Sequence, residues 1–153
     1  MSPALQRPHV LIVSDDPELT GFLGEGLVYA GFWTSAIASA VQALEVFRLR
    51  SFDVMVLDAA LGGIGALELL RRLRGRSDRA VAVERTDIPI LVIAGSSSEL
   101  DPALLVERAG ADQVIIAPIE LEQLAAELAR VVAAWRASHP GRQWADEAVL
   151  GPV

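Results

Sequence analysis

Two aspartates stand at the ends of apolar segments, where their carboxylates could bind a metal ion. Asp15 closely follows the apolar run at 9–13, and Asp58 ends the run at 52–58. If both runs are neighbouring parallel strands, the carboxylates lie at one edge of the sheet and repel each other unless a cation lies between them. A hard ion such as Mg²⁺ prefers oxygen ligands, so Asp15, Asp58 and a main-chain carbonyl after Asp58 could bind it. In the alternative interpretation, Asp15 and Asp16 cap a helix and Asp58 caps a turn.

Other reactive side chains are scarce. The chain has no cysteine, and its 13 basic residues are all arginine. Thiol chemistry, zinc–thiolate sites and any mechanism that needs a lysine ammonium are therefore excluded. His9 and His139 stand near opposite ends of the chain, without the partners of a catalytic triad. The glycines around 21–26 and 62–65 match neither a dinucleotide fingerprint nor a phosphate-binding loop, so we expect close packing or loop flexibility there.

Two polar clusters each allow a plain and a functional interpretation. The serines at 96–98 are expected to cap a helix, although one of them could supply a hydroxyl to a site. Five arginines lie at the end of the third predicted helix and just after it: Arg71, Arg72, Arg74, Arg76 and Arg79. Cations favour the C-terminal end of a helix and a solvated surface, and the alternative is a docking patch for an acidic partner.

Alternating apolar runs and amphipathic stretches predict the elements that position these residues. Strands are expected near 9–13, 32–36, 52–58, 88–94 and 114–116, and helices near 17–30, 40–47, 67–73, 102–109 and 121–135. Strands that are apolar nearly throughout are typical of a parallel sheet covered on both faces. Five βα units in this order predict an α/β fold with a doubly wound, five-stranded parallel sheet, whose site lies beyond the carboxyl ends of the strands.

The ends of the helices are marked by residue type. Asp16 and Ser39 are expected to cap the first and second helices, Pro17 to begin the first, and Gly110 to end the fourth. The first helix is expected to carry an apolar stripe along one face. That stripe consists of Leu19, Phe22, Leu23, Leu27 and Tyr29.

Length and composition indicate one folded domain. The chain has 153 residues, a hydrophobic content of 52%, a net charge of −7 and a mean hydropathy of +0.40. No apolar run is long enough to cross a membrane, and the acidic balance argues against nucleic acid as the main partner. We expect a cytoplasmic protein with a lead at 1–8, a domain at 9–136 and a tail at 137–153. A polar stretch at 74–87 interrupts the pattern.

Four segments together resemble the receiver domain of response regulators in two-component signalling. They lie at 10–17, 54–61, 89–95 and 110–112, in the order and at the strand ends typical of the family. The resemblance implies a sheet in the order 2-1-3-4-5. It also implies that Asp58 accepts a phosphoryl group from a histidine kinase or a phosphotransfer protein. Mg²⁺ would then be bound by Asp15, Asp58 and the backbone carbonyl of Ala60.

The chain departs from the receiver pattern at four positions, which suggests an atypical member. Ser14 replaces the first member of an acidic pair, and Ala94 replaces a threonine or serine at the end of the fourth strand. Ala117 stands where the family has a lysine, and Val114 stands where it has an aromatic switch residue. Lysine and hydroxyl groups in a receiver stabilise the charge of the phosphoryl group, so their loss weakens phosphoryl transfer. The usual switch also loses its moving ring.

These residues are compatible with three functions. The first is a single-domain regulator in a phosphorelay, a phosphoprotein and not an enzyme, whose output is contact with a downstream protein. The second is a pseudo-receiver that acts as an interaction or dimerisation module without phosphorylation. The third is a small enzyme or cofactor binder on the same fold, for which the sequence offers no nucleophile or phosphate loop.

Overall fold

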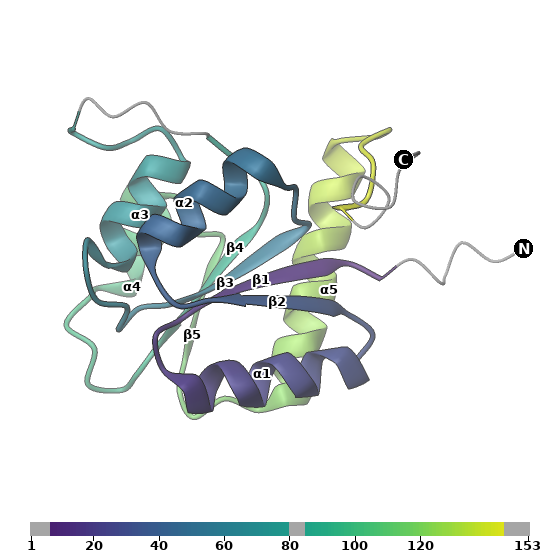
Figure 1. Ribbon diagram of the computed structural model, residues 1–153, viewed down its shortest axis with the longest axis horizontal. Coiled ribbons are helices and arrows are strands. Elements are labelled where there is room, and N and C mark those ends of the chain that lie inside the picture. The colour runs from purple at the N-terminus through teal and green to yellow at the C-terminus, as the bar shows by residue number, and fades with distance from the viewer. Residues whose placement is uncertain (1–6, 80–84, 146–153) are drawn as a thin grey trace, which may run out of the picture.

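A five-stranded parallel sheet forms the centre of the protein. The computed structural model describes residues 7–79 and 85–145. Its strands are β1 (His9–Val13), β2 (Trp33–Ile37), β3 (Val54–Asp58), β4 (Ile90–Ala94) and β5 (Gln113–Ile116). They pair in the order β2-β1-β3-β4-β5, and every pair is parallel (Figure 1). The doubly wound sheet and its strand order are therefore confirmed.

Helices cover both faces of the sheet (Figure 1). They are α1 (Pro17–Tyr29), α2 (Ala40–Leu49), α3 (Gly65–Leu73), α4 (Pro102–Leu104) and α5 (Leu121–Ser138). The segment expected as one α-helix at 102–109 continues after α4 as a π-helix, η2 (Leu105–Ala109). The helices α1 and α5 pack on one face, whereas α2, α3 and η2 pack on the other.

Successive strand residues alternate between the two cores, because side chains along a strand point to opposite faces. On β1, Val10 and Ile12 pack with α1 and α5, whereas Leu11 and Val13 pack with α2 and α3. All four side chains are buried. This double burial explains why the central strands β1, β3 and β4 are apolar nearly throughout, whereas β2 is partly exposed.

The caps predicted at Asp16, Ser39 and Gly110 are confirmed, and part of the predicted stripe is wrong. Asp16 accepts hydrogen bonds from the first turn of α1, Ser39 does so for α2, and Gly110 ends η2 in the left-handed conformation. Within α1, however, Phe22 is half exposed and Tyr29 is 94% exposed. The buried residues of α1 are Leu23 and Leu27, four residues apart on one helix face, whereas Tyr29 lies on the opposite face.

The end of α5 and the residues that follow it belong to the packed domain. The helix continues to Ser138, and Trp144 packs against the core that α1 and α5 share with the sheet. Ala145 is buried, and its backbone N–H donates to Asp53 Oδ1 at 3.0 Å. The predicted tail at 137–153 therefore begins as part of the fold, and residues 146–153 lie outside the described part.

Close packing explains one of the glycines of α1. A Cβ atom on Gly26 would collide with the side chain of Leu121 at the start of α5, whereas one on Gly21 would meet nothing within 4 Å. We expect Gly26→Ala to lower the free energy of unfolding by about 1 kcal/mol or more, because Leu121 must leave its place. Gly21→Ala is the matched control and is expected to stabilise by up to about 1 kcal/mol. Urea denaturation measures both, and equal effects would show that Leu121 does not constrain Gly26.

Three of the five clustered arginines are bound within the chain. Arg72 Nε donates to Glu68 Oε2 at 2.8 Å, and this bond holds the pKa of the Glu68 carboxyl below its usual value. Arg76 donates to the carbonyls of Glu107 and Arg108 at the end of η2. These contacts support the plain interpretation of the cluster, in which its cations complement helix ends.

Arg74 is the most firmly held member of the cluster. Its side chain is 11% exposed and donates to three acceptors: Gly110 O at 2.9 Å, Thr86 O at 2.8 Å and Asp112 Oδ2 at 2.9 Å. Burial lowers the pKa of the guanidinium, and the charge of Asp112 counteracts that shift. The arginine therefore ties the end of α3 to the segments that lead into β4 and β5.

Replacing Arg74 is expected to destabilise the fold. Arg74→Gln removes charge-assisted hydrogen bonds and leaves carbonyl groups without a donor, which we expect to cost about 2 kcal/mol or more. The control is Arg48→Gln, since Arg48 is 59% exposed in a surface ion pair, for which we expect less than about 0.5 kcal/mol. Guanidinium denaturation of both variants measures the difference. An Arg74 variant as stable as the Arg48 variant would contradict the anchoring role.

Candidate functional site

Neighbouring strands deliver the two predicted carboxylates to one edge of the sheet. Val13 at the end of β1 pairs with Leu57, the residue before Asp58 on β3. Asp15 and Asp58 therefore both lie at the carboxyl ends of their strands. The carboxyl ends of β1 and β3 are on the left side of Figure 1. This is the edge at which open α/β sheets carry their sites.

Asp58 is partly exposed, and both of its oxygens accept hydrogen bonds. The Ser14 hydroxyl donates to Oδ2 at 2.6 Å, and the backbone N–H of Ala60 donates to Oδ1 at 2.9 Å. The carboxylate is thus fixed between the end of β1 and the loop that follows β3. A carboxylate held in this way has a defined orientation, which is a requirement for a positioned phosphoryl acceptor.

The Ser14 hydroxyl both donates and accepts a hydrogen bond. The side chain is 2% exposed, and its oxygen accepts a hydrogen bond from Asp16 N at 3.1 Å while it donates to Asp58. Its backbone N–H donates to Ile37 O at the end of β2. The residue that replaces an acid in the family pattern therefore contacts Asp58 directly.

Asp15 faces the same loop as Asp58. Its Oδ2 accepts a hydrogen bond from Gly62 N at 3.1 Å, two residues beyond the Ala60 N–H that binds Asp58. Asp16, in contrast, turns its carboxylate to the first turn of α1, where it accepts from Glu18 N and Leu19 N. The structure therefore brings Asp15, Asp58 and Ala60 together, and it commits Asp16 to helix capping.

The donor set at this edge fits a weakly held magnesium ion. Mg²⁺ is commonly bound through one or two carboxylates and keeps several waters, which Asp15 and Asp58 can accommodate. Ser14 contributes a neutral hydroxyl in place of a third carboxylate. Within residues 7–79 and 85–145, no group of three or more His, Cys, Asp or Glu side chains is placed to hold a metal ion. A site with two carboxylates is expected to bind the ion less tightly than one with three.

The two positions that lack the family's phosphate ligands lie side by side. The backbone N–H of Ala117 donates to Ala94 O at 2.8 Å, so the ends of β4 and β5 are joined at the edge that carries Asp58. Ala94 is 1% exposed, and Ala117 is partly exposed. Neither methyl group can donate a hydrogen bond or supply a positive charge. A phosphoryl group on Asp58 would meet no side-chain donor from these two residues.

Val114 occupies the predicted switch position without a ring. It is partly buried and packs against the core formed with α2, α3 and η2. The serines at 96–98 are exposed, and Ser98 Oγ accepts from Leu100 N in a turn before α4. The expectation that these serines cap the helix is wrong, because Asp101 caps α4 by accepting from Ala103 N at 3.0 Å.

Sequence reasoning missed the hydrogen bond between Ser14 and Asp58. The available signal was a hydroxyl one residue before Asp15, at the end of a strand adjacent to the one that carries Asp58. Another aspartate, Asp53, is buried but does not belong to this site. It lies before β3, at the opposite edge of the sheet, where it accepts from His9 N and Ala145 N.

Comparison with known proteins identifies the family. The family model of the response regulator receiver domain matches residues 10–129, and the chain therefore belongs to this family. Regulatory protein VirG of Agrobacterium tumefaciens is 31% identical over 120 residues, which cover 78% of this chain and 42% of VirG. DNA-binding response regulator MtrA of Mycolicibacterium smegmatis is 30% identical over 122 residues, or 80% of this chain and 49% of MtrA. The chain thus spans about half the length of the curated relatives it matches.

Solved structures agree with this assignment. A sensor protein from Polaromonas sp. JS666 is 28% identical with a TM-score of 0.70, and the match covers 84% of this chain and 98% of that chain. The receiver domain of a Francisella response regulator has a TM-score of 0.72 at 19% identity, covering 84% of this chain and 99% of that one, which supports the fold. Among the described residues, no helix combines the length and apolar character needed to cross a membrane.

Proposed function

We propose that the protein is an atypical receiver that accepts a phosphoryl group slowly on Asp58 and passes its signal by contact with another protein. The observation that carries the proposal is that the site keeps its phosphoryl acceptor but lacks the side chains that would bind the phosphoryl oxygens. Asp58 and Asp15 share one loop, whereas Ala94 and Ala117 stand together at the same edge without a donor. This arrangement keeps the acceptor and weakens the stabilisation of the transferred group.

The residues of the site have different roles in phosphoryl transfer. A carboxylate oxygen of Asp58 forms the new bond to phosphorus while the bond from phosphorus to the donor atom breaks. Ala60 N and the Ser14 hydroxyl hold the carboxylate in place. Mg²⁺, when bound by Asp15, Asp58 and the Ala60 carbonyl, would supply positive charge at the phosphoryl oxygens. Because Ala117 and Ala94 supply neither a lysine nor a hydroxyl donor, the stabilisation would depend on the bound ion and on backbone N–H groups.

The proposed partners follow from this chemistry. A histidine kinase or a phosphotransfer protein donates the phosphoryl group, and a downstream protein receives the signal. The chain itself is proposed to be a cytoplasmic regulator and not an enzyme. Its net charge of −7 favours protein over nucleic acid as the partner of this region.

A titration with beryllofluoride and Mg²⁺, followed by NMR, tests whether the site binds a phosphoryl mimic. We expect changes in the amide signals of residues 58–62, with weak affinity and little change near Val114, because Val114 has no ring to move. Asp58→Asn is the control and should abolish the response. If the wild-type signals do not change when both ligands are present, the acceptor function fails.

A second candidate function, a pseudo-receiver that acts without phosphorylation, is favoured by one specific contact. The Ser14 hydroxyl donates a hydrogen bond to Asp58 Oδ2 at 2.6 Å. This bond could hold the Asp58 carboxylate permanently in one conformation. In that case Asp58→Asn would leave partner binding and the cellular output unchanged. Light scattering would show whether the chain dimerises, which is the simplest output of such a module.

A further inference from the structure

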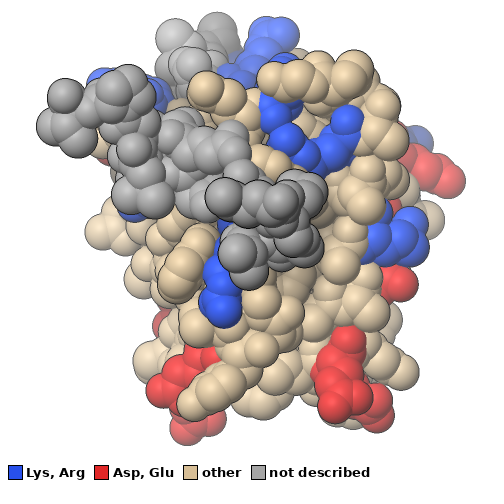
Figure 2. All heavy atoms as spheres, turned by 90° about the vertical axis from the view of Figure 1, so that its right-hand side faces the viewer, with Lys and Arg blue, Asp and Glu red and all other residues tan. Residues whose placement is uncertain are grey.

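A pocket of about 900 Å³ lies at the edge of the sheet opposite Asp58. Its walls come from the segment before β3, the segment before β4, and the end of α5 with the residues after it. This edge faces the viewer in Figure 2, where many of the basic side chains gather in the upper half and the largest acidic groups lie at the bottom. The pocket volume lies in the range of pockets that bind small molecules.

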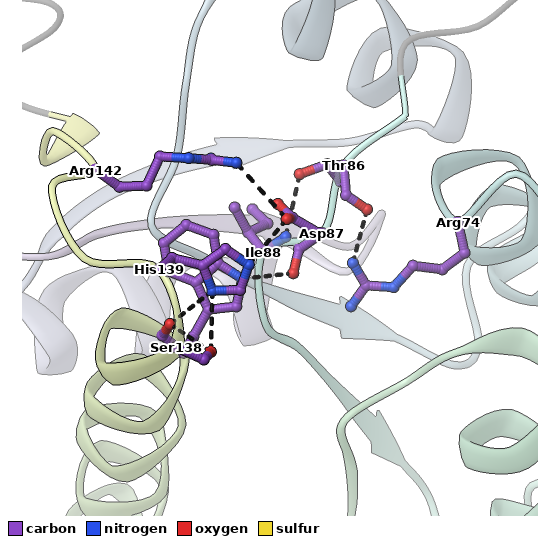
Figure 3. Close-up of polar contacts among 8 residues, drawn as sticks. Arg74, Thr86, Asp87, Ile88, Ser138, His139 and Arg142 are labelled. Carbon is purple, nitrogen blue, oxygen red and sulfur yellow. Dashed lines mark hydrogen bonds and ion pairs between the residues drawn. The ribbon is translucent and has the colours of Figure 1, made fainter.

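Four arginines from different segments line this pocket, in a chain whose net charge is −7. They are Arg50, Arg74, Arg85 and Arg142. Arg74 is committed to its three acceptors, one of which is Thr86 O (Figure 3). The guanidinium of Arg50 lies over the Phe52 ring at 5.5 Å, and that of Arg142 lies over the Trp135 ring at 5.3 Å. Both rings restrain their arginines at the pocket wall.

The two carboxylates of the pocket are already engaged. Asp53 is buried and accepts hydrogen bonds from His9 N and Ala145 N. Asp87 lies 3.1 Å from His139 Nε2 and 3.7 Å from Arg142, and both side chains reach it from the end of α5 and the residues after it (Figure 3). Neither carboxylate is therefore free to neutralise the remaining cations.

Among the residues that the structure describes, Arg50 and Arg85 have no carboxylate partner. Both are exposed, and neither forms an ion pair with any acidic residue in the described part of the chain. Arg142 forms only a long ion pair with Asp87, at 3.7 Å. Arg50, Arg85 and Arg142 therefore place three guanidinium groups around the pocket. Guanidinium forks bind phosphate oxygens in pairs and keep their charge at every accessible pH.

We propose that this pocket binds a small molecule that carries two or more linked phosphate groups. The number of cations matches a multiply charged anion, and the volume leaves room for a group of nucleoside size beside the phosphates. The site is independent of Asp58, because it lies at the amino ends of the strands, whereas the phosphoacceptor lies at their carboxyl ends.

Isothermal titration calorimetry of the full chain without added divalent metal tests the proposal. The probes are pyrophosphate, ADP, adenosine and citrate. We expect pyrophosphate and ADP to bind, and adenosine and citrate to bind at least about tenfold more weakly. Tighter binding of ADP than of pyrophosphate would identify a nucleotide site, and equal binding would identify a site for the diphosphate group alone. No binding of either diphosphate, or equal binding of citrate, would overturn the proposal.

Matched variants locate the site. Arg50→Gln with Arg85→Gln is expected to weaken diphosphate binding about tenfold or more, whereas Arg48→Gln with Arg130→Gln removes the same charge outside the pocket and should have little effect. Asp58→Asn should leave binding unchanged. Equal losses in both double variants, or a loss in Asp58→Asn, would place the ligand elsewhere and overturn the proposal. Since Arg50 and Arg85 are exposed, both variants are expected to fold, and circular dichroism checks this.

Discussion

Phosphorylation of Asp58 is expected to accelerate by a factor of about 10² or more when Ala94 becomes serine and Ala117 becomes lysine. Serine adds one hydroxyl at the end of β4, and lysine adds a positive charge at the end of β5. Both positions lie at the edge that carries Asp58, where the phosphoryl oxygens would lie. Loss of one preorganised donor costs about 10² to 10³ in rate in other enzymes, so restoring two should exceed the lower figure. The rate is measured by intact mass with a small phosphodonor and Mg²⁺.

The charge of the lysine can be separated from its length. Ala94→Ser with Ala117→Gln carries a neutral side chain of similar reach and is expected to recover only a small part of the rate. Ala94 is 1% exposed, so serine is a better choice than threonine for a buried position. If the glutamine variant is as fast as the lysine variant, missing positive charge is not what weakens the site.

Replacing Ser14 with aspartate is expected to tighten Mg²⁺ binding about tenfold or more. The change adds a third carboxylate beside Asp58 and removes the hydroxyl that donates to Asp58 Oδ2. Affinity for a hard divalent ion rises with the number of charged ligands. Without the ion, the added charge repels Asp58 and lowers the stability of the fold. Thermal unfolding across a Mg²⁺ series therefore shows a lower midpoint without the ion and a larger rise with it than in wild type.

The variant Ser14→Asn shows whether the effect of Ser14→Asp comes from its negative charge or from its larger side chain. Asparagine has the size of aspartate and no charge, so its unfolding midpoint should respond to Mg²⁺ no more than that of wild type. A similar response in the asparagine and aspartate variants would show that the number of carboxylates does not limit Mg²⁺ binding. Calcium in place of magnesium would then reveal whether the edge binds divalent ions at all.

The fold was predictable because its three central strands are buried on both faces. Runs such as 54–57 carry apolar side chains toward both cores, and the alternation of five strand-like runs with amphipathic segments leaves few alternatives to a parallel sheet. The site followed from the fold, since strand ends determine which residues meet. On that basis Asp15 and Asp58 were expected at one edge, and the structure bonds both to the loop at 60–62.

The parts that were not predictable depend on side-chain geometry and on contacts far apart in the sequence. Tyr29 was assigned to the apolar stripe of the first helix, but its position on α1 turns it away from Leu27 and into solvent. Trp144 packs on a core formed by other elements, which its local sequence does not reveal. The bond between Ser14 and Asp58 depends on the direction of one hydroxyl, which the spacing of 44 residues cannot specify.

The most direct test of the weakened acceptor is a time course of intact mass with a small phosphodonor and Mg²⁺, for wild type, Asp58→Asn, and Ala94→Ser with Ala117→Lys. We expect wild type to gain one phosphoryl group slowly, the double variant to gain it much faster, and Asp58→Asn to gain none. If wild type gained nothing while the double variant was phosphorylated, Asp58 would not be an acceptor in the native chain. Equal rates in wild type and the double variant would contradict the claim that Ala94 and Ala117 limit the reaction.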